Sequence, residues 1–222
     1  MNINSTLDAV FESLQEGNLK KALDVCERIL KKKPDNVDAL NILGTIYFQL
    51  NQSDLAISSF RKAVQIDPNY AEAWNNLGNI FQLINRFDEA VSCYQKAVQL
   101  NPDLEQTYVN LGIVLQDVGR LDEAIPCYQK AISLNPRLYG AYNNLGLALQ
   151  DKGHIDEAIR CYQNAVKINP DFAEAYYNFG NALKEKQHLD QALALYEKAI
   201  QIHPRYAEAY NNLGIILGIS SN

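Results

Sequence analysis

The chain has 222 residues, of which 47% are apolar, 21% charged and 9% aromatic, a composition typical of a folded protein rather than a disordered one. Its formal net charge of -6 argues against a nucleic-acid partner, because binding to phosphates depends on clustered lysine and arginine. No stretch approaches the roughly 20 apolar residues of a membrane span, and the first residues lack the features of a signal peptide, so we expect a cytoplasmic chain without a membrane partner.

Proline recurs at a constant interval and divides the chain into repeats. Because proline cannot donate an interior helix N–H, each of these prolines is expected to end a helix. Only Pro126 is out of phase, and we expect it to disturb its helix without breaking it. No linker interrupts the series, so the sequence predicts one solenoid domain over residues 1–222. Its repeats are 1–34, 35–68, 69–102, 103–136, 137–170 and 171–204, followed by a half repeat, 205–222.

Each repeat contains two predicted helices, A and B. The apolar residues of helix A recur at i, i+3, i+4 and i+7, as in Trp74, Leu77, Gly78 and Phe81. Those of helix B follow after a break, as in Ala90, Tyr94, Ala97 and Val98. The residue at the break is one that tolerates the left-handed conformation that ends a helix, with Gln187 as the exception. The others are Gly17, Asn51, Asn85, Gly119 and Gly153.

This pattern resembles the tetratricopeptide-repeat (TPR) signature. The resemblance rests on Trp74-x-x-Leu77-Gly78-x-x-Phe81 followed by Ala90, Tyr94, Ala97 and Pro102, and it recurs along the chain with tyrosine in place of Trp74. It implies an all-α fold, a right-handed α-solenoid (superhelix) of about thirteen helices in antiparallel pairs. Repeat 1–34 lacks the signature residues, so we expect it to be a degenerate N-terminal cap.

A column of glycines lies on the apolar face of helix A, which favours close helix packing over a phosphate-binding loop. We expect a column of alanines in helix B to form the other half of this contact. The glycines are Gly44, Gly78, Gly112, Gly146, Gly180 and Gly214, and the alanines are Ala56, Ala90, Ala124, Ala158 and Ala192.

Five asparagines form a second column on helix A, which we call the ladder. Stacked helices place them roughly 10 Å apart, and an extended peptide advances about 3.3 Å per residue, so one amide can meet every third residue of a guest. An amide both donates and accepts, so exposed amides could pair with any peptide backbone. The alternative interpretation is that these asparagines serve local solubility or hydrogen bonding between helices. The ladder is Asn76, Asn110, Asn144, Asn178 and Asn212, and its amide neighbours are Asn41, Asn75, Asn79, Asn143, Asn181, Asn211, Gln82, Gln116 and Gln150.

The ladder, together with the segment 69–78, resembles the superhelical TPR region of O-linked N-acetylglucosamine transferase. The resemblance implies that the ladder lines a concave groove that holds a polypeptide. The sequence therefore predicts a peptide-binding scaffold, with two alternatives: the substrate-recognition module of a larger, glycosyltransferase-like enzyme, or a self-assembling structural solenoid. The guest is expected to be neutral or basic, because acidic residues flank the ladder. They are Asp38, Glu72, Glu174 and Glu208.

Catalysis by this chain, a cofactor and a bound metal are not expected. No CxxC or HxxxH spacing occurs, and His154 and His188 fall in predicted exposed turns. Cysteines at equivalent places in successive repeats are too distant for disulfides and are expected to be buried free thiols. They are Cys93, Cys127 and Cys161. Cys26 lies one position after the equivalent place in its own repeat.

The last predicted helix, 207–219, has no helix B after it in this sequence. We expect Tyr210, Leu213, Gly214 and Leu217 to pack on the preceding repeat. Other apolar residues would then remain uncovered, and self-association through this helix is expected. They are Ile215, Ile216 and Ile219.

Overall fold

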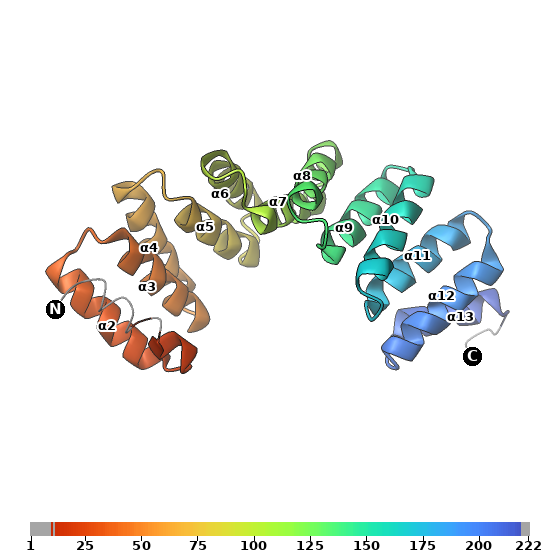
Figure 1. The fold of residues 1–222 in the computed structure, drawn as a ribbon, viewed down its shortest axis with the longest axis horizontal. Coiled ribbons are helices and arrows are strands. Elements are labelled where there is room, and N and C mark those ends of the chain that lie inside the picture. Colours follow the sequence, from red (N-terminus) through yellow and green to blue (C-terminus); the bar gives the residue numbers. More distant parts are fainter. Residues whose placement is uncertain (1–9, 11, 219–222) are drawn as a thin grey trace. The chain divides into compact units, whose positions relative to one another are not determined.

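The computed structural model describes residue 10 and residues 12–218, and all regular secondary structure in this part of the chain is helical (Figure 1). This confirms the all-α fold class. Residues 12–15 are helical, but the first predicted helix lies partly outside the described residues. Twelve further helices follow within the described part: α2 (Leu19–Lys32), α3 (Val37–Gln49), α4 (Ser53–Ile66), α5 (Ala71–Leu83), α6 (Phe87–Leu100), α7 (Glu105–Asp117), α8 (Leu121–Leu134), α9 (Tyr139–Asp151), α10 (Ile155–Ile168), α11 (Ala173–Glu185), α12 (Leu189–Ile202) and α13 (Ala207–Ile216).

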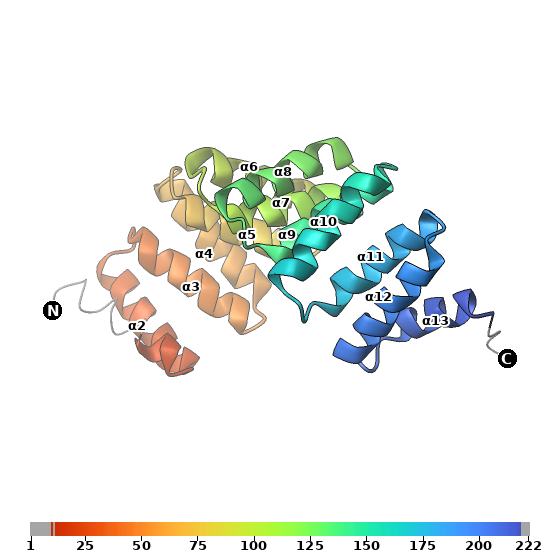
Figure 2. The same cartoon turned by 45° about the vertical axis from the view of Figure 1, so that its right-hand side comes forward.

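The contacts divide the chain into two compact halves, residues 1–114 and residues 115–222. In the N-terminal half, α3 packs against α4 and α5 against α6. In the C-terminal half, α9 packs against α10, α11 against α12, and α13 against α12 (Figure 2). The odd-numbered helices from α3 are the predicted A helices and the even-numbered ones are the B helices. The predicted helix pairs are thus present in each half.

The breaks within repeats are left-handed helix ends, as the sequence predicts. Asn85 has φ of 58°, and the N–H of Arg86 donates to the carbonyl oxygen of Phe81 at 2.7 Å. The N–H of Asn85 donates to the carbonyl of Gln82 at 3.0 Å, which completes a Schellman motif. Gln187, the exception in the sequence, adopts the same conformation with φ of 63°.

Gln187→Gly is therefore expected to stabilise the protein by roughly 0.5–1 kcal/mol. A side chain in the left-handed region is strained, whereas glycine adopts it freely. The gain should be seen as a higher urea midpoint. Gly153→Gln, at the equivalent position with φ of 79°, should lower the midpoint. If both variants shift the midpoint in the same direction, backbone strain is not what the substitutions change.

Between repeats, an Asx turn follows α4, α6, α8 and α10 and spans the proline. The Oδ1 of Asn101 accepts from the N–H of Asp103 at 3.1 Å, and the Oδ1 of Asn135 accepts from the N–H of Arg137 at 3.1 Å. The side chain thus fixes the turn where the proline ends the helical hydrogen bonding. Pro126 does not break α8, which continues to Leu134, as predicted.

Four glycines of the column have an aromatic ring of helix B as their nearest neighbour, where the sequence predicted alanines; they are Gly44, Gly78, Gly146 and Gly180. A Cβ built on Gly78 would lie 2.5 Å from Cε1 of Tyr94, and one on Gly180 would lie 2.7 Å from Cε1 of Tyr196. The nearest atoms in both cases belong to the ring. The physical reason is that the flat ring from helix B lies across the backbone of helix A. Only glycine, which has no Cβ, leaves room for the ring at this position. The alanines are buried but are not the nearest neighbours of the glycines.

All four cysteines are free thiols, as expected, but only Cys26 and Cys93 are buried. Cys127 and Cys161 are half-buried. Cys93 lines a cavity together with the rings of Trp74 and Phe81. Burial raises the pKa of the Cys93 thiol to about 11, so it stays protonated at neutral pH.

Candidate functional site: the asparagine ladder

In the N-terminal half, ladder asparagines join successive A helices. The Nδ2 of Asn76 donates to the Oδ1 of Asn41 at 2.9 Å, which links α5 to α3. The Nδ2 of Asn110 donates to the Oδ1 of Asn79 at 3.1 Å, which links α7 to α5. Asn75, beside the ladder, accepts from the hydroxyl of Thr107 at 2.8 Å. The Oδ1 of Asn110 accepts from Gln106.

In the C-terminal half, the same kind of bond joins α11 to α9 and α13 to α11. The Nδ2 of Asn178 donates to the Oδ1 of Asn143 at 3.0 Å, and the Nδ2 of Asn212 donates to the Oδ1 of Asn181 at 2.9 Å. Asn143 is 1% exposed and Asn178 is 7% exposed. The expectation that these amides are exposed is therefore wrong for this pair, because each is covered where it bonds to the other.

A simple rule accounts for these partners. Within each half, the bonded ladder residues reach a position 35 or 31 residues earlier. These two positions are four apart and so lie on one face of the preceding A helix. The acceptor at the first distance is Asn41, Asn143 or the hydroxyl of Tyr177, and at the second distance it is Asn79 or Asn181.

Three ladder residues keep unused hydrogen-bonding capacity. Asn144 is half-buried and its side chain makes no hydrogen bond to the described residues. The Oδ1 atoms of Asn76 and Asn178 likewise have no donor there. Since no fully buried side-chain polar atom of the described residues lacks a partner, these acceptors reach solvent. They are atoms that a bound chain could contact.

The predicted glutamines lie beside the ladder, and each accepts from a buried tyrosine. The Oε1 of Gln150 accepts from the hydroxyl of Tyr162 at 3.0 Å, while its Nε2 donates to the Oε2 of Glu185 at 3.0 Å. Gln82 and Gln116 accept from tyrosine hydroxyls in the same way. These tyrosines were not predicted from the sequence to be part of the site. The signal that could have found them is the constant spacing between each tyrosine and its glutamine.

Exposed carboxylates accompany the amides, as predicted. Glu72, Glu174 and Glu208 lie in the first turns of α5, α11 and α13 and are exposed. Glu174 accepts from the Nδ2 of Asn143 at 3.0 Å, so this carboxylate belongs to the same network. Asp38 accepts from a tyrosine instead of an amide: the hydroxyl of Tyr70 donates to it at 3.0 Å. The neighbourhood of the ladder is therefore rich in acceptors.

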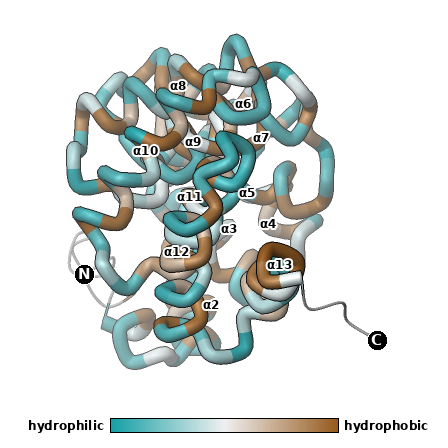
Figure 3. The backbone as a smooth tube through the Cα atoms, turned by 90° about the vertical axis from the view of Figure 1, so that its right-hand side faces the viewer, coloured by the Kyte–Doolittle hydropathy of each residue, from teal (hydrophilic) through white to brown (hydrophobic). Residues whose placement is uncertain are grey.

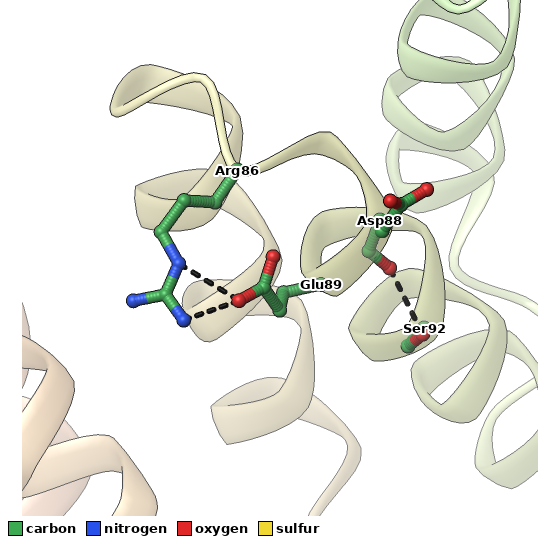
Figure 4. A network of polar contacts seen from close by, with 4 residues as sticks. All are labelled: Arg86, Asp88, Glu89 and Ser92. Atoms are coloured by element: carbon green, nitrogen blue, oxygen red, sulfur yellow. Dashed lines mark hydrogen bonds and ion pairs between the residues drawn. The ribbon is translucent and has the colours of Figure 1, made fainter.

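The N-terminal half also contains a cavity of about 350 Å³ that the sequence did not predict. Among its lining residues, Glu89 accepts at Oε1 from the Nε of Arg86 at 2.8 Å, and the hydroxyl of Ser92 donates to the Asp88 carbonyl (Figure 4). The hydrogen bond from Arg86 lowers the pKa of Glu89. The cavity is lined by Arg61, Val64, Trp74, Leu77, Phe81, Asp88, Glu89, Ser92 and Cys93.

The C-terminal helix α13 packs differently from the prediction. Leu213 and Ile216 pack against the core formed by Leu183 and Tyr196, whereas Leu217 is 52% exposed. The reason is register: Leu217 corresponds to Leu183, which helix B of its own repeat covers. Tyr210 and Ile215 are also exposed, and the apolar end of α13 is visible in Figure 3. Residue 219 lies outside the described residues.

The structure adds little on metals and membranes. No group of three or more metal-binding side chains occurs among residues 10 and 12–218. Within the same range no helix is long and apolar enough to cross a membrane. His154 and His188 are exposed at the starts of α10 and α12, as predicted.

Comparison with known proteins decides the family. A family model for the C-terminal TPR domain of cilia and flagella-associated protein 70 matches residues 12–212. The chain belongs to this TPR family. A curated relative, Protein CTR9 homolog of Arabidopsis thaliana, is 39% identical over 54 residues. These residues are 24% of this chain and only 5% of that much longer protein.

Solved structures share the TPR fold. MamA is 32% identical, with a TM-score of 0.67 over 73% of this chain and 95% of its own. YrrB, described as a TPR protein with an unusual peptide-binding site, is 24% identical, with a TM-score of 0.75 over 84% of this chain and 96% of its own. The resemblance to O-linked N-acetylglucosamine transferase, and a role within a larger enzyme, stay predictions.

Proposed function

We propose that this TPR protein is an interaction scaffold that holds an extended polypeptide against the ladder. The observation that carries the proposal is the set of solvent-accessible amide acceptors on Asn76, Asn144 and Asn178. Their side chains are anchored or half-buried, so a guest loses little affinity to ordering them. YrrB, which is described as having a peptide-binding site, supports the same kind of function.

The chemistry of these atoms favours a guest that donates hydrogen bonds. Unused oxygens can accept from backbone N–H groups, which every residue except proline supplies. The exposed carboxylates of Glu72, Glu174 and Glu208 favour a guest with lysine or arginine side chains between the residues whose backbone N–H groups are bound. The partner is therefore a neutral or basic segment, bound more by its backbone than by its sequence.

Asn144→Ala is expected to weaken peptide binding about three- to tenfold, the equivalent of one or two hydrogen bonds. Its side chain makes no hydrogen bond to a described residue, so we expect the fold to be little affected. The probe is a short peptide selected from a random phage-displayed library against the unchanged protein, measured by calorimetry. Asn164→Ala, an exposed asparagine on α10, is the control and should bind like the unchanged protein. Equal affinity of both variants would remove the ladder from the binding site.

Self-association is a second candidate, favoured by the uncovered face of α13. Ile215 is 62% exposed and Leu217 is 52% exposed, and this apolar surface could be buried against a second copy of the chain. Leu217→Glu should then give a monomer by light scattering at concentrations where the unchanged protein is larger. Leu55→Glu, a similarly exposed leucine on α4, should not change the mass. A monomeric unchanged protein would contradict the idea.

A further inference from the structure

Four fully buried tyrosines carry their hydroxyls from the B helices to the amides beside the ladder. Each donates to an amide oxygen on helix A of its own repeat, at 2.8–3.0 Å. The acceptor lies 12 or 15 positions earlier in the chain. The pairs are Tyr94 with Asn79 and Gln82, Tyr128 with Gln116, Tyr162 with Gln150, and Tyr196 with Asn181.

The glycine column gives these hydroxyls their path. A Cβ on Gly146 would lie 2.5 Å from Cε1 of Tyr162, so the ring passes helix A where no side chain intervenes. The rings are 0% exposed, yet the amides they reach are half-buried. The tyrosine thus connects the core of the repeat to the surface that carries the ladder.

Amides occur where the tyrosine can reach them. Every repeat with this tyrosine has asparagine or glutamine at one or both of the two positions. In repeat 35–68 the tyrosine is replaced by Phe60, which has no hydroxyl, and the two positions hold Phe48 and Thr45. Hydroxyl and amide are therefore present together or absent together in these five repeats, as expected if they work as a pair.

The hydroxyl decides which end of the amide faces inward. Because it donates, it holds the carbonyl oxygen toward the core and leaves the NH₂ group on the outer side. The NH₂ of Gln150 then donates to Glu185 at 3.0 Å, and that of Gln116 donates to Asp151 at 3.3 Å. At Asn181 the oxygen accepts in addition from the ladder residue Asn212.

We propose that these buried tyrosines are positioning residues for the amides of the binding surface, which they orient so that donors face outward and ladder contacts form. The effect on guests rests on the proposed function. The orientation of the amides does not, because it follows from contacts within each repeat. The alternative is that the hydroxyl of Tyr162 merely finds an acceptor for its own proton. In that case the hydrogen bond to Glu185 alone would keep the Gln150 side chain ordered.

Tyr162→Phe tests the proposal by removing one hydroxyl. Phenylalanine is tolerated at this position, since Phe60 is 1% exposed in its repeat. The side-chain NH₂ of Gln150 is followed by NMR and assigned by its absence in Gln150→Glu. Its resonances should shift and its ¹H–¹⁵N heteronuclear NOE should fall. Tyr70→Phe, which removes a hydroxyl bonded to Asp38, is the control and should leave the Gln150 signals unchanged.

Binding provides the second measurement. Tyr162→Phe should weaken the library-selected peptide about three- to tenfold, and Tyr70→Phe should not. Unchanged order of Gln150 in Tyr162→Phe would overturn the proposal whatever the affinity. If no library peptide binds the unchanged protein, the proposed function fails, while the NMR comparison still decides whether the tyrosine positions the amide.

Discussion

Gly146→Val is expected to lower the stability of the C-terminal half by roughly 3 kcal/mol. A Cβ at this position would lie 2.5 Å from Cε1 and 2.9 Å from Cδ1 of Tyr162. The ring cannot easily move aside, because it is fully buried and its hydroxyl is held by Gln150. The change should appear as a lower urea midpoint in circular dichroism.

Gly140→Val is the matched control on the same helix. A Cβ on Gly140 meets no atom within 4 Å, and α9 begins only one residue earlier. Valine has a higher helix propensity than glycine, so this variant should be as stable as the unchanged protein or slightly more so. The double variant Gly146→Val, Tyr162→Ala should lose less than the sum of its single changes, because the smaller side chain removes the collision. Equal midpoints for the two glycine variants would show that the ring tolerates a side chain at Gly146.

The helices and their ends could be predicted because they depend on neighbouring residues. The proline at the end of each repeat fixes where helix B ends, and glycine or asparagine fixes the left-handed turn. Gln187 also adopts this turn, although the residue type does not predict it. These features are local, so a single sequence contains the information.

The hydrogen bonds of the ladder could not be predicted in the same way. A column of asparagines, one in each repeat, does not show whether each amide faces solvent or the next repeat. That depends on how helix A of one repeat lies against the next, which brings positions 31 and 35 apart into contact. The half-buried Asn144 and the buried Asn178 therefore look alike in the sequence. The tyrosine hydroxyls were missed because their rings were interpreted only as core.

Asn178→Ala is expected to destabilise the C-terminal half by about 1–3 kcal/mol. The change removes the donor of a 3.0 Å hydrogen bond and leaves the Oδ1 of Asn143 without it. Because Asn143 is only 1% exposed, water cannot readily replace the lost donor. Urea denaturation should show the loss, although alanine is the better helix former.

Two further variants separate the buried bond from other effects. Asn144→Ala, next to Asn143 on α9, removes an amide without a described partner and should stay within about 0.5 kcal/mol of the unchanged protein. Asn143→Ala combined with Asn178→Ala should cost less than the sum of the single changes, since neither partner is then left unpaired.

The comparison also decides which ladder residue can report on binding. If Asn178→Ala is destabilised as expected, a variant with several ladder asparagines removed would lose affinity through its fold as well as through its contacts. The single change at Asn144 avoids this ambiguity. If Asn178→Ala is as stable as Asn144→Ala, the bond to Asn143 contributes nothing measurable, and Asn178 becomes an equally clean test of peptide binding.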